Sequence, residues 1–404
     1  MLMVTQPLPH SSGREKAIRG LQAIAALDEP QVILSPYRLC PLGAHVDHQY
    51  GDVLAFALDH GVYLAFQSHD DNMLLASDEF AGNLTISLQS PMSQKNDWGD
   101  YARGAYWVLS QAFAEKGALR GMICYSVGGR SQCGLSSSAA IGLAYLKALS
   151  ICNDIELSQQ QLIEYDRQIE NEYLGLKNGI LDPAAIVFGA DQALVHIDTR
   201  VRSARLVETK KVDVQADWLA IHSGFKQALT PQNYNSRVEE SIEAAQRLIE
   251  LNGGEPSEQV RLGDVPHEVW QKFKGHLASG LARRAEHFYT ETQRVALGVK
   301  AWQAGEVEQL GQLMTASSVS SVENYECGSG PVKDLVNIVN SAQHVYGARF
   351  CGPGFRGCSV ALVEKGCADI VYAQVIDEYA QAHPDLAQES WALLCQPSEG
   401  IRLI

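Results

Sequence analysis

Three short segments of the chain hold residues whose types and spacing suit chemistry on a small ligand. The first, residues 35–51, reads SPYRLCPLGAHVDHQYG and places Arg38, His45 and Asp47 in a turn punctuated by Gly and Pro. A polar site on a loop has such a composition, but so does a solvated surface turn. Composition alone therefore favours a solvated surface turn over a ligand-binding site.

The second segment reads SVGGRSQCGLSSSAAIG and runs from Gly128 and Gly129 into a helix that we expect to begin at about Ser136. Small residues let the backbone come close to a ligand, and the free amides of a helix N-terminus attract phosphate. The segment is neither a Walker A loop, which needs G-x-x-x-x-G-K, nor a dinucleotide G-x-G-x-x-G fingerprint. A Ser-rich helix N-cap therefore explains it nearly as well as a nucleotide site.

The third segment, residues 346–363, reads YGARFCGPGFRGCSVALV and places a Gly-rich turn between two strand-like runs. Taken singly, such a pattern is most often a tight hairpin whose glycines adopt positive φ. None of the three segments identifies a site without the other two.

The composition limits the kind of ligand that these segments bind. The chain has 404 residues, 46% of them apolar, and a formal net charge of −15. Disorder and fibrous repeats are excluded, and two domains or one large α/β unit are expected. We expect neither nucleic acid nor a membrane as partner, because the acidic surface would repel either polyanion. A small molecule in an internal site fits better.

The cysteines and the start of the chain bear on its location. The nine cysteines are odd in number and show no C-x-x-C spacing, which predicts reduced, buried thiols. The first residues lack the basic region and the apolar stretch of a secretory signal, and no apolar run approaches the ~18 residues that cross a bilayer. We therefore expect a cytoplasmic protein.

Periodicity of the apolar residues predicts the elements that position the three segments. Helices are expected over residues 14–27, 101–113, 136–152, 158–174, 234–251, 283–301 and 368–382. Strands are expected over residues 31–35, 122–126, 191–197, 217–223, 346–351, 359–364 and 391–395. This mixture predicts the α/β class, with α+β packing of helices on a sheet near the C-terminus. We place a boundary near residue 205, between domains 1–205 and 206–404.

In order, spacing and wording, the three segments together resemble the motifs of the GHMP small-molecule kinases. Sugar kinases of that family carry Arg before a Gly-Glu-His-x-Asp turn, then Gly-Leu-Ser-Ser-Ser-Ala, then Gly-x-Gly-Phe-Gly-Gly-Cys. The matching residues here are Arg38, 43–47, 134–139 and 352–358, with further similarity at Glu170, 178–182 and 233–235. The resemblance covers nearly the whole chain. It implies a two-lobed fold, with a lobe like ribosomal protein S5, a ferredoxin-like lobe, and the active site in the cleft.

The resemblance also implies ATP and Mg²⁺ as cofactors and assigns roles to single residues. Asp182 would meet the sugar C1 hydroxyl as base or orienting group, and Arg38 would stabilise the transferred charge or hold Asp182 ionised. The metal would be held by Ser138 and Glu170, although on residue pattern alone Glu170 lies on a polar helix face where glutamates are usually solvated. The triphosphate would be cradled by Gly134, Leu135, Ser136, Ser137, Ser138 and Ala139.

Within the family, the wording is most similar to kinases that phosphorylate D-galacturonic acid at C1. Sugar contacts are then implied for His45, Asp47, Gly179 and Tyr234, although a turn histidine is more often only hydrogen-bonded within the fold. Galactokinases carry Glu where this chain has Ala44, near the sugar 6-hydroxyl. Two carboxylates ~4 Å apart repel by about 1 kcal/mol in water and by more when partly buried. Losing the glutamate would admit a C6 carboxylate; neutral drift is the alternative.

Some residues depart from the family pattern. Residues 130–133 replace a Pro- and Gly-rich lead into the serines, Pro183 follows Asp182, and Pro353 and Arg356 replace small residues. Arg356 either binds the substrate carboxylate through its bidentate fork or pairs with a surface acid.

Other activities remain open at this stage. They are a galactokinase, an L-arabinokinase, or a non-catalytic sensor that binds sugar and ATP. The expected partners are a sugar acid and ATP, in a monomer or a homodimer.

Overall fold

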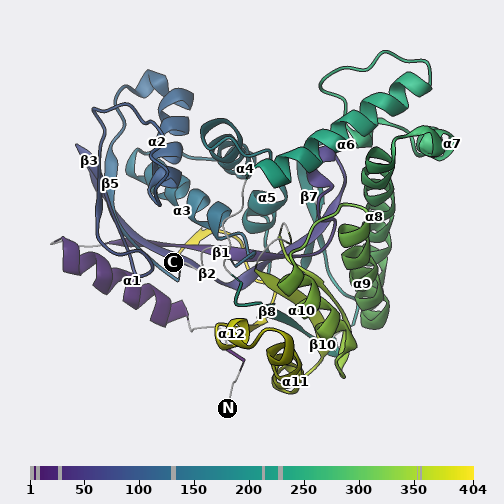
Figure 1. Cartoon of the computed structure of the whole chain (residues 1–404). Helices are drawn as coiled ribbons and strands as arrows, with labels where there is room; N and C mark the ends of the chain where they lie inside the picture. The colour runs from purple at the N-terminus through teal and green to yellow at the C-terminus, as the bar shows by residue number, and fades with distance from the viewer. Residues whose placement is uncertain are drawn as a thin grey trace.

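The computed structural model describes residues 4–5, 10–25, 30–128, 133–211, 214–225, 231–352, 354 and 357–404. For residues 10–11 and 231–234 only the backbone is described. Two sheets, each with its own helices, meet near the middle of the molecule (Figure 1).

The first sheet has eight strands in the order β12-β1-β2-β5-β3-β4, with β6 attached to β2 and β7 to β6. All of its neighbouring strands are antiparallel except β3 and β5, which run parallel. The strands are β1 Gln31–Leu42, β2 Val53–His69, β3 Asn72–Ser77, β4 Leu84–Ser87, β5 Gly121–Val127, β6 Leu194–Asp198, β7 Ser203–Val207 and β12 Arg402–Leu403. Its C-terminal strand β12 pairs with β1, so both ends of the chain contribute to this sheet.

Helices cover both faces of the first sheet (Figure 1). On one face, α1 (His10–Ile24) buries Ala17 and Leu21 in a small apolar cluster with β1, β2 and β5. The helices of the other face are α2 Asp100–Ala112, α3 Ser137–Cys152, α4 Gln159–Gln168 and α5 Leu181–Val187, with a π-helical turn at Ile169–Tyr173 after α4. Helix α3 is apolar almost all round because α2, α4 and the sheet enclose it.

The second sheet is antiparallel, in the order β11-β8-β10-β9. Its strands are β8 Ala216–His222, β9 Val345–Phe350, β10 Cys358–Glu364 and β11 Trp391–Cys395. Its other elements are α6 Pro231–Leu251, α7 His267–Phe273, α8 Ser279–Ala304, α9 Val307–Glu323, α10 Gly330–Ser341, α11 Ala368–Ala382 and α12 Pro384–Gln388. Short 3₁₀ turns lie at Asp47–Gln49, Ala114–Lys116, Leu262–Asp264 and Lys274–His276.

One face of this sheet packs on α10 and α11, and the other faces the first sheet. Trp218 of β8 lies 5.0 Å from the Phe56 ring of β2 and 5.9 Å from the Trp302 ring of α8, centroid to centroid. These contacts join the two sheets in one continuous apolar core.

The segment after residue 35 is partly a strand rather than the expected turn. Strand β1 continues to Leu42, and the turn begins only at Gly43. Pairing with β2 shifts between Pro36 and Arg38 and again between Leu39 and Leu42. Such bulges re-aim the side chains beside them. They explain how a strand accommodates two prolines and an arginine that pattern analysis assigns to a loop.

Most expected helices and strands are found within a few residues of their predicted ends. The helix expected over residues 158–174 is α-helical only to Gln168 and then becomes the π turn. The second sheet begins at Ala216, close to the domain boundary that we placed near residue 205. However, the C-terminal strand β12 pairs with β1 of the first sheet, so the chain does not divide cleanly there and the boundary remains a prediction. All nine cysteines lie in the described residues; none of them forms a disulfide, and all except Cys367 are buried. Among the described helices, none is long and apolar enough to span a membrane.

Candidate active site

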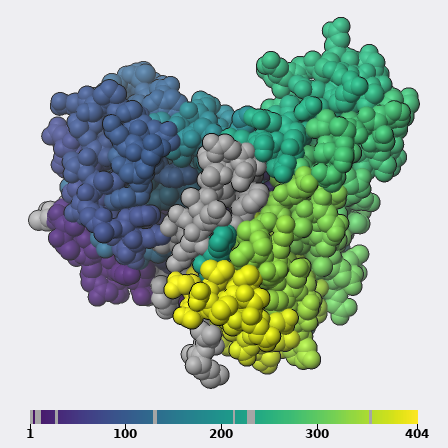
Figure 2. Space-filling view, in the orientation of Figure 1, coloured from purple at the N-terminus to yellow at the C-terminus, as the bar shows by residue number. Residues whose placement is uncertain are grey.

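A cavity of about 820 Å³ lies where the two sheet-and-helix units meet. In Figure 2 the purple-to-blue segments and the green segments form the two sides of the molecule and approach each other at its centre. The cavity wall includes most of the predicted site residues that the structure describes: Arg38, Ala44, His45, Asp47, Gly134, Ser136, Ser137, Ser138, Gly179 and Asp182. Segments far apart in the sequence thus form one site.

Arg38 and Asp182 form a direct ion pair in the cavity wall. The Arg38 Nε donates to Asp182 Oδ1 at 2.7 Å, and its Nη1 donates to the Gly134 carbonyl at 3.0 Å. Arg38 is almost fully buried at the β1 bulge, and Asp182 lies in the first turn of α5. The Ser136 hydroxyl donates to Asp182 Oδ2. Both carboxylate oxygens therefore accept hydrogen bonds, which fixes the orientation of Asp182.

The two glycine-rich segments pack against each other beside this ion pair. Gly134 has φ +79°, and a Cβ there would lie 2.8 Å from the Cys351 carbonyl oxygen. Gly352 has φ +73°, and its Cβ would lie 3.1 Å from the Gly134 carbonyl oxygen. Helix α3 begins at Ser137, next to the expected start, after Ser136 with φ 62°. Close approach of two backbones explains why glycine occupies both positions.

Asp47 is held against the segment that carries Asp182. It lies in the 3₁₀ turn at Asp47–Gln49, and its Oδ2 accepts a hydrogen bond from the Leu181 amide at 3.1 Å. A Cβ on Gly179 would lie only 2.1 Å from that oxygen, so the turn requires glycine there. Burial raises the pKa of Asp47 from 3.8 to about 6, and hydrogen bonding to Leu181 opposes this rise.

Glu170 is buried, with 2% exposure, and is not the solvated surface glutamate that its sequence pattern indicates. The π turn directs it inward, where Oε2 accepts from Asn178 Nδ2 at 2.6 Å and Oε1 accepts from the Tyr101 hydroxyl at 3.5 Å. Ser138 also hydrogen-bonds to it, and burial together with the Asp182 charge raises its pKa to about 7. Ser138 and Glu170 therefore meet, as a shared metal would require.

The turn that contains Ala44 and His45 contributes another part of the wall. The His45 ring stacks on Tyr325 with centroids 4.3 Å apart, and the Ala44 carbonyl accepts from His287 Nε2 at 2.9 Å. Burial and the nearby His287, Arg349 and His48 lower the pKa of His45 well below 6.5. The histidine is therefore neutral, and residue 44 presents only a methyl group to the cavity.

Many residues of the cavity wall were not predicted from the sequence, and three of them have side chains suited to binding a ligand. Phe80 and Trp98 stack with centroids 5.4 Å apart and an interplanar angle of 6°, a flat platform of the kind on which a nucleobase stacks. Arg349 of β9 is a fully buried arginine. A charged residue inside an apolar strand is the sequence signal that would have identified it.

Three predicted site residues with described side chains, Leu135, Ala139 and Glu170, are not part of the cavity wall. The side chains of Leu135 and Ala139 are completely buried in the core. Arg356 lies outside the described residues, and for Tyr234 only the backbone, in the first turn of α6, is described.

Comparison with known proteins defines the class to which this fold and site belong. Residues 100–190 match the family described as GHMP kinases N terminal domain. The chain is 39% identical over 426 residues to a galacturonokinase of Arabidopsis thaliana, covering 99% of this chain and 97% of the relative. The chain belongs to the GHMP kinase family.

Within that family the chain is galactokinase-like. A galactokinase of Thermococcus kodakarensis is 29% identical over 376 residues, covering 92% of this chain and 99% of the relative. The structure of Lactococcus lactis galactokinase complexed with galactose has a TM-score of 0.86 at 24% identity, covering 97% of this chain and 99% of that one. The family and the two-lobed α/β fold predicted from the sequence are thus confirmed, and members of this family use ATP.

Proposed function

We propose that this chain transfers the γ-phosphoryl group of ATP to the C1 hydroxyl of D-galacturonic acid, giving galacturonate 1-phosphate and ADP. The observation that carries the proposal is Ala44, which places a methyl group in the wall of the cavity that also holds Arg38 and Asp182. An acidic side chain at this position would repel a substrate carboxylate. The similarity to a galacturonokinase over nearly the whole chain supports the same substrate.

Asp182 and Arg38 are assigned to the transfer itself. The C1 oxygen attacks the γ-phosphorus, the bond to the β–γ bridging oxygen breaks and ADP leaves with its electron pair, and the hydroxyl proton passes to Asp182 as the new bond forms. Both oxygens of Asp182 already accept hydrogen bonds, so we assign this carboxylate to orient the hydroxyl rather than to remove its proton before transfer. Arg38 then offsets negative charge that spreads over the moving phosphoryl group.

The backbone of residues 134–139 and the start of α3 are assigned to the triphosphate, because free amides at a helix N-terminus attract phosphate. Ser138 and Glu170 supply hard oxygen donors that fit Mg²⁺, and the buried Glu170 would regain its charge beside a cation. A bound Mg²⁺ would offset charge on the phosphate oxygens. The Phe80–Trp98 pair is assigned to the adenine base. His45, Asp47, Gly179 and Tyr234 are assigned to the sugar.

The test is a substrate panel. The protein is incubated with ATP, Mg²⁺ and single hexoses, pentoses and uronic acids; ADP release is measured, and phosphorus NMR locates the product phosphate. We expect D-galacturonate to give the highest kcat/KM, with phosphate at C1. Preferred turnover of galactose or L-arabinose would contradict the substrate assignment. Saturable sugar binding without ADP release would favour a sensor.

A further inference from the structure

One cationic group in the cavity wall has hydrogen-bond donors without partners. Arg349 of β9 is 1% exposed, and its Nη1 donates to the Cys40 carbonyl at 3.4 Å. Its Nε and Nη2 have no hydrogen-bond partner among the described residues. Leaving a buried charged donor unsatisfied is costly, so such a group indicates a partner that the chain does not supply.

Arg349 acts electrostatically on Glu291 of α8, but the carboxylate oxygens of Glu291 already accept hydrogen bonds from other residues. Glu291 Oε1 accepts from the Gly43 amide at 2.7 Å and from the Ser317 hydroxyl at 2.6 Å, and Oε2 accepts from Arg294 Nε at 2.7 Å. Burial raises the pKa of Glu291, but the charges of Arg294, His287 and Arg349 outweigh it and lower the pKa to about 2. Glu291 therefore offsets the charge of Arg349 through space and leaves its donors free.

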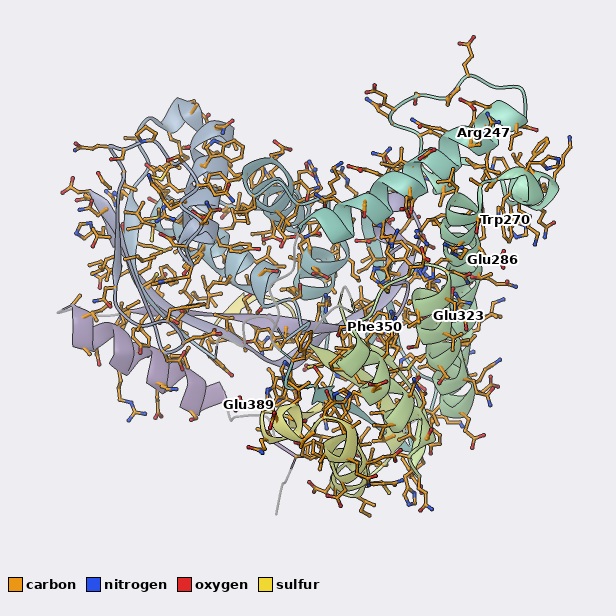
Figure 3. All side chains as sticks on the ribbon, in the orientation of Figure 1. Arg247, Trp270, Glu286, Glu323, Phe350 and Glu389 are labelled. Carbon is orange, nitrogen blue, oxygen red and sulfur yellow. The ribbon has the colours of Figure 1, made fainter. Side chains whose placement is uncertain are left out.

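The end of β9 faces the turn that contains Ala44. Phe350, the residue after Arg349, lies with its ring 6.3 Å from that of His45, the residue after Ala44. Figure 3 shows Phe350 near the centre of the molecule. Both Arg349 and Ala44 line the same cavity, and the Nε and Nη2 atoms of Arg349 are buried without a hydrogen-bond partner among the described residues.

From this geometry we infer that Arg349 binds the C6 carboxylate of the sugar acid, through Nε and Nη2 as a bidentate pair. The inference rests on the proposed function and names the residue that recognises the acid group. Parallel Nε and Nη2 donors match the two oxygens of a carboxylate, and the pair is strongest where water is excluded. The role that the sequence suggests for Arg356 stays a prediction, since that residue lies outside the described ones, whereas Arg349 lines the described cavity.

The test uses Arg349→Met and Arg349→Lys, with D-galacturonate, its neutral methyl ester and D-galactose as substrates. We expect Arg349→Met to raise the KM for galacturonate roughly 10- to 100-fold, the size of effect expected for lost charge-assisted hydrogen bonds. The KM for the methyl ester should change much less, so the acid-to-ester preference falls. Arg349→Lys keeps the charge without the fork and should lie between wild type and Arg349→Met.

The matched control is Arg294→Met, which removes the other arginine beside Glu291 but lies outside the cavity wall. It should lower the melting temperature while leaving the acid-to-ester preference unchanged. An unchanged preference in a folded Arg349→Met protein would overturn the inference; if that variant does not fold, an unchanged preference in Arg349→Lys decides likewise. A wild-type protein that does not phosphorylate galacturonate would instead overturn the proposed function, so the two failures are distinguishable.

Discussion

Replacing Ala44 by Glu restores the acid that the cavity wall lacks, and Ala44→Gln is the matched control of the same size and no charge. Ala44 is 6% exposed, so bulk water screens its side chain poorly. Two carboxylates ~4 Å apart repel by about 1 kcal/mol in water and by about 4 kcal/mol at an effective dielectric constant near 20. Because 1.4 kcal/mol is a tenfold change, the added charge should lower kcat/KM for galacturonate between roughly fivefold and several hundredfold.

The assay measures kcat and KM for galacturonate and galactose at pH 8, where carboxylates are ionised. The change in kcat/KM caused by Ala44→Gln measures the effect of the larger side chain. The further loss of kcat/KM in Ala44→Glu measures the effect of the added charge. We expect that further loss for galacturonate and not for galactose. Equal kinetics for the Glu and Gln variants would show that bulk, not charge, decides. Unchanged galacturonate turnover in Ala44→Glu would refute the reasoning altogether.

Three further predictions follow from the site geometry. Asp182→Asn should fold normally, as circular dichroism would show, yet lose most of its kcat; a preserved kcat would remove Asp182 from the reaction. Gly179→Ala places a Cβ 2.1 Å from Asp47 Oδ2 and should lower the free energy of unfolding, measured in urea, by about 1–3 kcal/mol. The control Gly280→Ala, whose Cβ has no atom within 4 Å, should not lower it. Equal effects of the two variants would contradict the Gly179–Asp47 contact. The folded-state pKa of Asp47, about 6, exceeds its ordinary 3.8, so its ionisation opposes folding above pH 6. Asp47→Asn should therefore raise the free energy of unfolding at pH 8 by about 1–3 kcal/mol, and this gain should vanish as the pH falls from 6 to 4; a gain that does not depend on pH would point to another cause.

Local patterns in the sequence were sufficient to predict an element where the spacing of its own apolar residues determines its structure. The helix expected over residues 368–382 is α11 Ala368–Ala382, because apolar residues recur at helical spacing along its buried face. Strand β2 was not predicted, since most of it is buried on both faces and its residues show no polar alternation. The strand predicted over residues 31–35 ended too early, because Pro36 and Arg38 are typical of loops. In the structure, bulges let strand β1 accommodate both residues.

The candidate site depends on contacts that no local pattern contains. Arg38 and Asp182 are 144 positions apart, and only the order of the motifs suggested that they meet. Glu170 is buried because the π turn points it toward Tyr101 and Asn178, which helical periodicity does not predict. The ligand-binding role proposed for Arg349 rests on its Nε and Nη2 donors, which have no hydrogen-bond partner among the described residues. Only the structure shows this.

The most direct test of the central claim is a competition between two substrates in one tube. Wild-type protein receives limiting ATP with equimolar D-galacturonate and D-galactose, and mass spectrometry measures the ratio of the two sugar 1-phosphates. A cavity wall with a methyl group at position 44 and a free guanidinium predicts that galacturonate 1-phosphate predominates. A predominance of galactose 1-phosphate would contradict the account.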